Sequence, residues 1–126
     1  MENVLEQKDI LTERIIGCCF KLHNEIGPGF LERIYHNGLM IALTDAGLRY
    51  ETEKEFEVYF NKRKIGKFRC DLLVEEKVIV ELKSISGHLP ILFNHQVISY
   101  LRASKVKTGL LINFGNTSCQ IKRISV

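Results

Sequence analysis

The sequence predicts a single α/β domain spanning residues 1–126, with a mixed β-sheet flanked by helices and the element order ααβββαββ. Three observations lead to this prediction. Apolar residues recur at helical spacing in residues 9–26 and 30–46, which a Gly-Pro-Gly sequence separates. Apolar and charged residues alternate over Glu51–Phe60, as in a half-buried strand. A helical segment later connects two apolar strands, and such a crossover favours one parallel pair.

The N-terminal part of the chain predicts two helices. The first is expected to be capped by Asp9 or Thr12 and to run to about Ile26. Pro28 cannot continue a helix, and the glycines beside it permit backbone angles that other residues avoid. The second helix is expected over residues 30–46, and a glycine follows it directly.

The rest of the chain predicts five strands and one further helix. After Glu51–Phe60 comes a polar turn over residues 61–64, and short apolar runs bounded by turn residues follow it. The expected strands are Glu51–Phe60, Ile65–Val74, Val78–Lys83, Thr108–Phe114 and Cys119–Ile124, and the expected helix is Ile91–Ser104.

Composition excludes several classes of protein. The four cysteines form no C-x-x-C pair, so neither a zinc site nor a disulfide scaffold is expected, and free thiols suit a reducing compartment. The charged N-terminus does not resemble a signal segment, and no apolar run is long enough to span a membrane. We therefore expect a soluble cytoplasmic protein without a membrane partner. The net charge of +3 is compatible with an anionic partner but does not require one.

The segment DLLVEEKVIVELK, residues 71–83, places acids inside core-like sequence. If Glu75-Glu76-Lys77 is a three-residue hairpin loop, Asp71 stands opposite Glu81 on one face of the sheet. Opposed carboxylates repel each other, and burial makes an isolated carboxylate costly. A two-residue loop would instead put the two acids on opposite faces.

A positive charge is expected beside two acids on one face. Lys83 points to the same face as Glu81, and a salt bridge on a solvated face would explain the pattern without any function. A divalent cation is the other explanation, because Mg²⁺ takes carboxylate and carbonyl oxygens together with water. The pattern alone does not separate these two interpretations.

Two motifs together resemble a known enzyme superfamily. The pattern Asp71…Glu81-x-Lys83 looks like the core of the PD-(D/E)XK nucleases, although Cys70 stands where the proline would be. The segment GFLERIY, residues 29–35, matches the GxxExxY motif that names one family within this superfamily. The match continues to GLLINFG, residues 109–115, and so covers nearly the whole chain. The resemblance implies a restriction-endonuclease-like core.

The resemblance also implies a metal site. Asp71, Glu81 and the backbone carbonyl of Leu82 would bind Mg²⁺, for which Mn²⁺ may substitute, and Lys83 would orient the attacking water. Glu32 would supply a third carboxylate, although an acid in a first helical turn also simply complements the helix dipole.

Supporting residues are assigned in the same way. Gln96 and Tyr100 resemble the Q-x-x-x-Y motif of RecB-type members, while a polar helix edge is the alternative. Tyr35 is expected to pack in the core, with its hydroxyl near a site carboxylate. Five basic residues of one hairpin are candidates for phosphate binding, with a solvated turn as the alternative: Lys62, Arg63, Lys64, Lys67 and Arg69.

The function that follows from the resemblance is Mg²⁺-dependent hydrolysis of nucleic acid, with DNA favoured over RNA. An alternative is a nuclease-like fold that only binds nucleic acid or protein. A chain of this size has little beyond the core, so specificity is expected to come from a homodimer or a larger complex.

Overall fold

The computed structural model describes residues 4–126, with side chains from Ile10 onward. The element order is ααβββαββ, as the sequence predicts. The helices are α1 (Val4–Ile26), α2 (Glu32–Asp45) and α3 (Ile91–Ser104), and the strands are β1 (Tyr50–Phe60), β2 (Arg63–Val74), β3 (Val78–Lys83), β4 (Thr108–Asn113) and β5 (Gln120–Ser125). None of the helices in this part of the chain combines the length and apolarity needed to cross a bilayer.

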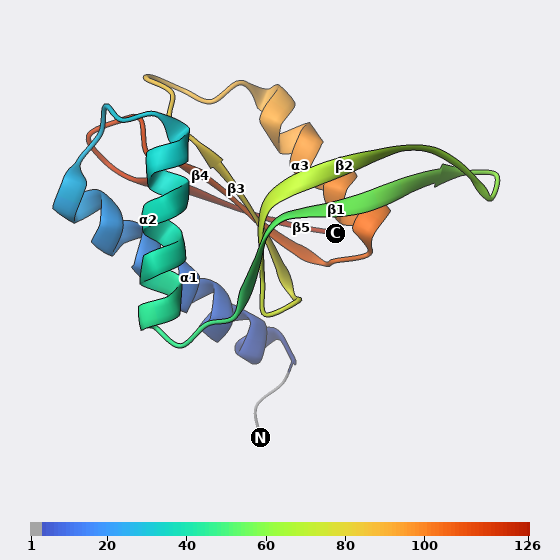
Figure 1. The fold of residues 1–126 in the computed structure, drawn as a ribbon, viewed down its shortest axis with the longest axis horizontal. Coiled ribbons are helices and arrows are strands. Elements are labelled where there is room, and N and C mark those ends of the chain that lie inside the picture. Colours follow the sequence, from blue (N-terminus) through green and yellow to red (C-terminus); the bar gives the residue numbers. More distant parts are fainter. Residues whose placement is uncertain (1–3) are drawn as a thin grey trace.

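One sheet in the order β1-β2-β3-β4-β5 forms the middle layer of the molecule (Figure 1). Strands β3 and β4 are parallel, and every other neighbouring pair is antiparallel. The predicted parallel pair is therefore confirmed. The crossover between these strands is α3, because a parallel connection needs a long return path. The α/β fold class with a mixed sheet flanked by helices is confirmed as well.

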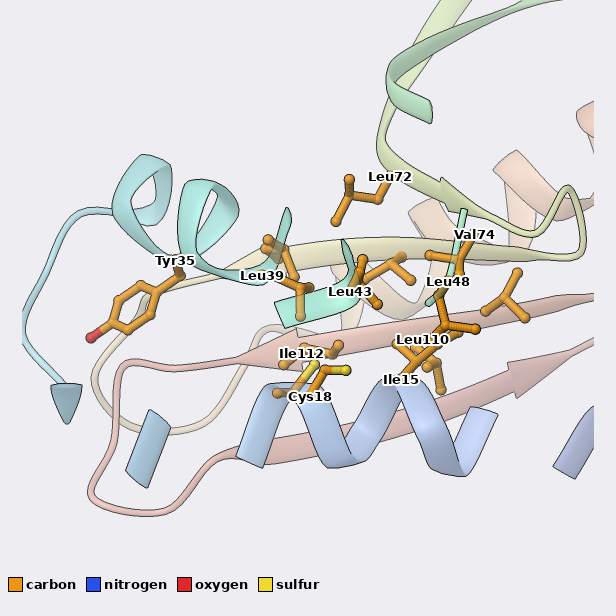
Figure 2. Packing of buried hydrophobic residues seen from close by; sticks show 14 of the residues in the cluster. Ile15, Cys18, Tyr35, Leu39, Leu43, Leu48, Leu72, Val74, Leu110 and Ile112 are labelled. Carbon is orange, nitrogen blue, oxygen red and sulfur yellow. The ribbon is translucent and has the colours of Figure 1, made fainter. Parts of the chain in front are cut away.

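Two hydrophobic clusters lie on opposite faces of the sheet. The larger one packs α1 and α2 against the sheet and includes Ile15, Leu39, Leu72 and Ile112 (Figure 2). The smaller one packs α3 against the other face through residues such as Val97 and Leu111. The helices therefore form two outer layers, and β3 lies at the centre of the sheet with both faces covered.

The start of α1 differs from the sequence prediction. The helix begins at Val4, so both Asp9 and Thr12 lie inside it and neither caps it. The residues between Val4 and Asp9 are compatible with helix, and no glycine or proline stops the helix from extending toward the N-terminus. Thr12 is buried, and its hydroxyl accepts a hydrogen bond from Arg123 Nη2 at 2.7 Å.

The start of α2 also differs, because the helix begins at Glu32 and not at Phe30. The intervening loop is held by Tyr35, whose hydroxyl donates to the Gly27 carbonyl at 2.6 Å and accepts from the Phe30 N–H at 3.3 Å. These bonds keep the loop out of the helix. Gly29 has a φ of 105°, which favours glycine.

Candidate active site

The β2–β3 hairpin has the register that brings two carboxylates to one place. Val74 pairs with Val78 and Leu72 pairs with Val80, so the three-residue loop of the sequence prediction is confirmed. The loop has no glycine; Glu75 and Glu76 take the left-handed conformation instead, with φ of 52° and 57°. The Glu75 side chain accepts a hydrogen bond from the Arg49 N–H at 2.6 Å, which ties the loop to the start of β1.

Side-chain hydrogen bonds join β2 and β3 beyond Leu72, where the backbone pairing of the two strands ends. The Asp71 N–H donates to Glu81 Oε1 at 3.0 Å, and the Leu82 N–H donates to Asp71 Oδ2 at 2.8 Å. Each carboxylate therefore reaches across to the other strand. The structure brings Asp71 and Glu81 together, which a two-residue loop would have prevented.

Glu81 is a buried carboxylate with only 5% of its surface exposed. Burial and, second, the negative charge of Asp71 raise the pKa of Glu81 from 4.5 to about 8. The hydrogen bond from the Asp71 N–H and the charge of Lys83 act in the opposite direction and are outweighed. The interpretation of a salt bridge on a solvated face does not hold for Glu81, because this carboxylate is buried.

Lys83 does not neutralise the pair by direct contact. Its ammonium lies over the Phe93 ring of α3, 4.3 Å from the ring centroid. Among the described residues, Lys83 forms no ion pair with a carboxylate within 4.0 Å. The salt bridge is thus absent in this part of the chain, and the positive charge stands beside the acids without binding them.

Glu32 is the first residue of α2 and lies within range of the charges of Asp71 and Lys83. Burial of its carboxyl and then the charge of Asp71 raise its pKa, while Lys83 and His36 lower it. The carboxyl is thus partly buried, although the residue as a whole is exposed. Among the side chains described, those of residues 10–126, no three His, Cys, Asp or Glu residues are grouped closely enough to hold a metal ion by themselves. Glu32, Asp71 and Glu81 therefore interact through their charges without forming such a group.

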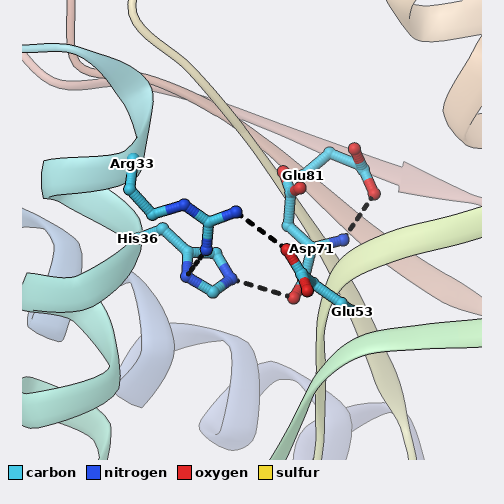
Figure 3. A network of polar contacts seen from close by, with 5 residues as sticks. All are labelled: Arg33, His36, Glu53, Asp71 and Glu81. Carbon is cyan, nitrogen blue, oxygen red and sulfur yellow. Dashed lines mark hydrogen bonds and ion pairs between the residues drawn. The ribbon is translucent and has the colours of Figure 1, made fainter.

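A polar network behind the site was not predicted from the sequence (Figure 3). The His36 ring is buried, and its Nε2 lies 3.1 Å from the carbonyl oxygen of Asp71. Arg33 lies 3.4 Å from His36 Nδ1 and forms an ion pair of 2.8 Å with Glu53. Helix α2 is thereby attached to the backbone of Asp71 itself. The sequence contains one signal that could have indicated His36: it follows Glu32 by one helical turn and therefore lies on the same face of the helix.

The backbone of the sheet is irregular at Asp71. Cys70 belongs to the cluster under α3, whereas Leu72 belongs to the cluster under α1 and α2, so the alternation of faces shifts between them. The residue of β1 at this level is Glu53, which has a φ of 50°. Such a φ is costly for a residue other than glycine, and strained backbone of this kind is common at functional sites.

Tyr35 packs as predicted, but its hydroxyl does not approach a site carboxylate. The ring is fully buried and stacks on Phe114 with centroids 4.5 Å apart. The hydroxyl is occupied by Gly27 and Phe30 in the loop before α2. That part of the prediction is wrong, because the hydroxyl points to the loop that precedes α2 and fixes where the helix starts.

Gln96 and Tyr100 lie on α3, which covers the face of the sheet to which Glu81 and Lys83 point. Tyr100 stacks on Phe68 of β2 with centroids 4.1 Å apart. Burial and then the charges of Glu81 and Asp71 raise the pKa of Tyr100, which places its hydroxyl within electrostatic reach of the acids. Gln96 is half-buried, one turn after Phe93 and one turn before Tyr100.

The five basic residues of the β1–β2 hairpin divide into two groups. Lys64, Lys67 and Arg69 form ion pairs with acids of β1, at 3.3, 3.5 and 3.0 Å. Lys62 and Arg63 lie at the tip and form no ion pair with any residue in the range 10–126. Arg69 shares a strand with Asp71, but its guanidinium is bound to Glu55 of β1.

Comparison with known proteins assigns the chain to a family. A model of the PD-(D/E)XK nuclease superfamily matches residues 9–124, and the chain therefore belongs to this superfamily. The superfamily consists in general of nucleases, which hydrolyse phosphodiester bonds. A search of curated proteins finds no match.

One solved structure with the same fold is that of a protein called SSO0001. The two chains superpose with a TM-score of 0.59 at 22% sequence identity, over 74% of this chain and 48% of that one. The chain thus spans about half the length of SSO0001. The likeness supports the restriction-endonuclease-like arrangement of the fold.

Proposed function

We propose that this protein is a Mg²⁺-dependent nuclease of the GxxExxY family that hydrolyses phosphodiester bonds of DNA. The observation that carries the proposal is that the buried carboxylate of Glu81 lies beside the half-buried carboxylate of Asp71. The pKa of Glu81 near 8 means that the pair resists full ionisation when no cation is present. A protein gains nothing in stability from such a pair, so a bound cation is the simplest reason for it.

The residues at this position suit Mg²⁺. The donors are carboxylate oxygens, and Mg²⁺ is typically held by one or two carboxylates together with water, so a group of three protein ligands is not required. The second oxygens, Asp71 Oδ1 and Glu81 Oε2, accept no hydrogen bond from residues 10–126. We assign these oxygens to the metal.

The carbonyl of Leu82 completes the proposed ligand set. In an extended strand the N–H and C=O of one residue point to the same side. The Leu82 N–H donates to Asp71, so its carbonyl is directed toward the same edge. The carbonyl of the next residue, Lys83, accepts from the Phe114 N–H at 2.9 Å and is directed toward β4. Glu32 would contribute a third carboxylate through a bound water.

The chemistry divides between the metal and the chain. A bound divalent cation would lower the pKa of a water molecule and balance negative charge on the phosphate. Lys83 holds an ammonium beside the acids without being paired to them, so it is free to meet a phosphate oxygen. Gln96 would hold the attacking water by its amide, and Tyr35 and His36 position the elements that carry the acids.

The test is cleavage of duplex DNA in the presence of Mg²⁺. Wild-type protein should cut, and Glu81→Gln and Lys83→Met should each lower the rate by at least a hundredfold. Glu76→Gln and Lys77→Met are matched controls, because both residues are exposed in the loop of the same hairpin. If the wild type binds DNA but does not cleave it with any divalent metal, the result would favour the alternative of a protein that only binds.

Other expectations from the sequence remain proposals. These are the single domain over residues 1–126, the cytoplasmic location, the capacity of Mn²⁺ to replace Mg²⁺, and a homodimer. Phosphate binding by the basic hairpin is also a proposal, with Lys62 and Arg63 the best candidates because no acid among residues 10–126 forms an ion pair with them.

A further inference from the structure

Strands β1 and β2 extend beyond the sheet as a two-stranded arm (Figure 1). We define the arm as residues 54–69. Its base is supported by an aromatic stack in which Tyr100 of α3 packs on Phe68, and Phe68 lies 5.2 Å from Phe56 between ring centroids. Beyond this stack the exposed fractions of Tyr59, Phe60 and Ile65 rise to 57%, 65% and 66%.

The arm carries the positive charge of the protein. It contains six basic residues and two acidic ones, a net charge of +4, whereas the whole chain has +3. Glu55 is paired with Lys67 and Arg69, and Glu57 is paired with Lys64 and also accepts from the Tyr59 hydroxyl. The charge that remains available is concentrated at the tip, on Lys62 and Arg63.

The tip has a defined shape. Phe60 pairs with Arg63, and the two residues between them, Asn61 and Lys62, have φ of 49° and 63°. Two positive φ values are typical of a type I′ turn, whose twist matches that of the two strands. The side chains of Phe60, Lys62 and Arg63 are therefore presented on an ordered hairpin end.

The dimensions of the arm suit one kind of nucleic acid. At about 3.3 Å per residue, the eight steps along the strand from Asp71 to Arg63 span about 26 Å. The major groove of B-form DNA, about 12 Å wide, admits a two-stranded β-ribbon. The major groove of A-form RNA is too deep and narrow to be entered in this way. The arm can therefore lie along a DNA groove while its base stays at the candidate active site.

We propose that the β1–β2 arm binds in the major groove of duplex DNA and presents one strand to Asp71 and Glu81. Lys62 and Arg63 bind phosphates across the groove, and Phe60 and Ile65 contact the apolar groups of bases and sugars. The position of the cleaved strand rests on the proposed function, whereas DNA binding by the arm does not. A second copy of the arm is disfavoured as the partner, because two arms of charge +4 repel each other.

The test is a binding measurement in EDTA, so that the result does not depend on metal or cleavage. Fluorescence anisotropy would compare labelled duplex DNA, duplex RNA of the same sequence and single-stranded DNA. The variant is Lys62→Ala/Arg63→Ala, and its control is Lys77→Ala/Lys122→Ala, which removes the same charge from exposed residues outside the arm. Circular dichroism checks that each variant remains folded.

Wild type and control should bind duplex DNA at least tenfold more tightly than duplex RNA. The arm variant should lose at least tenfold in affinity for duplex DNA, and its slope of log Kd against log salt should fall by about 1.8, for two lost phosphate contacts. Phe60→Ser should lower affinity without changing that slope.

Equal affinity of the arm variant and the wild type would overturn the proposal. So would equal binding of duplex RNA, or a loss of self-association in the arm variant with no change in DNA binding. The proposed nuclease activity is judged separately. DNA binding that depends on the arm, without metal-dependent cleavage, would reject the nuclease activity and support DNA binding by the arm. Cleavage that the arm variant leaves unaffected would support the nuclease activity and reject the role of the arm.

Discussion

Replacing Glu81 with glutamine should stabilise the metal-free protein at alkaline pH. The Gln side chain keeps an oxygen that can accept from the Asp71 N–H, as Glu81 Oε1 does at 3.0 Å. What the substitution removes is the buried negative charge opposite Asp71. A surface carboxylate changed in the same way, Glu76→Gln, serves as the control because Glu76 is exposed in the adjacent loop.

The size of the effect follows from the pKa of Glu81. Burial and the Asp71 charge raise it from 4.5 to about 8. Each pKa unit corresponds to about 1.4 kcal/mol, so keeping Glu81 ionised in the folded state costs up to about 5 kcal/mol. The pKa of Glu81 is higher in the folded state than in the unfolded state. Below pH 4.5 Glu81 is protonated in both states and costs nothing, and folding stability is lost progressively as the pH rises from 4.5 through about 8.

The assay is urea unfolding in EDTA at a series of pH values between 5 and 9. The free energy of unfolding of the wild type and of Glu76→Gln should fall across this range, and that of Glu81→Gln should fall by about 2–5 kcal/mol less. Saturating Mg²⁺ at pH 8.5 should restore the wild type and leave Glu81→Gln unchanged. Parallel curves for wild type and Glu81→Gln would show that burial and charge do not perturb Glu81.

The remaining predictions concern the support of the site. Tyr35→Phe should lower the free energy of unfolding by about 1–3 kcal/mol in urea, since the Gly27 carbonyl loses its donor; an unchanged value would contradict the role of that bond. Glu76→Gly should raise it by about 1 kcal/mol, because a φ of 57° suits glycine; a loss would contradict the assigned strain. His36→Ala should lower kcat at least tenfold through displacement of Asp71, with partial recovery in His36→Gln; equal rates would remove His36 from the positioning of the site.

The sequence was sufficient to predict the elements and the hairpin that carries the acids. Helix Ile91–Ser104 and strand Val78–Lys83 have the predicted bounds, because apolar spacing and the turn residues around them agree. The register of Leu72–Val74 against Val78–Val80 followed from the length of one loop, and it brings Asp71 and Glu81 close together. Loop length was decisive because side chains alternate along the paired part of these two strands, from Leu72 to Val80.

The contacts around the acids could not be predicted in this way. The bond between His36 and the Asp71 carbonyl joins positions 35 residues apart, and helical spacing does not say which strand a helix faces. The left-handed conformation of Glu53 has no signal in the sequence, since this residue type does not favour it. The length of α1 was underestimated because a polar segment can continue a helix without an apolar pattern.

The central claim, that Asp71 and Glu81 share a divalent cation, is tested most directly by calorimetric titration with Mn²⁺ at pH 8. Wild type and Glu76→Gln should bind one Mn²⁺ per chain, and Asp71→Asn and Glu81→Gln, both folded by circular dichroism, should show no heat of binding at this site. Equal binding by all four proteins, or none by the wild type, would contradict a metal site at this carboxylate pair.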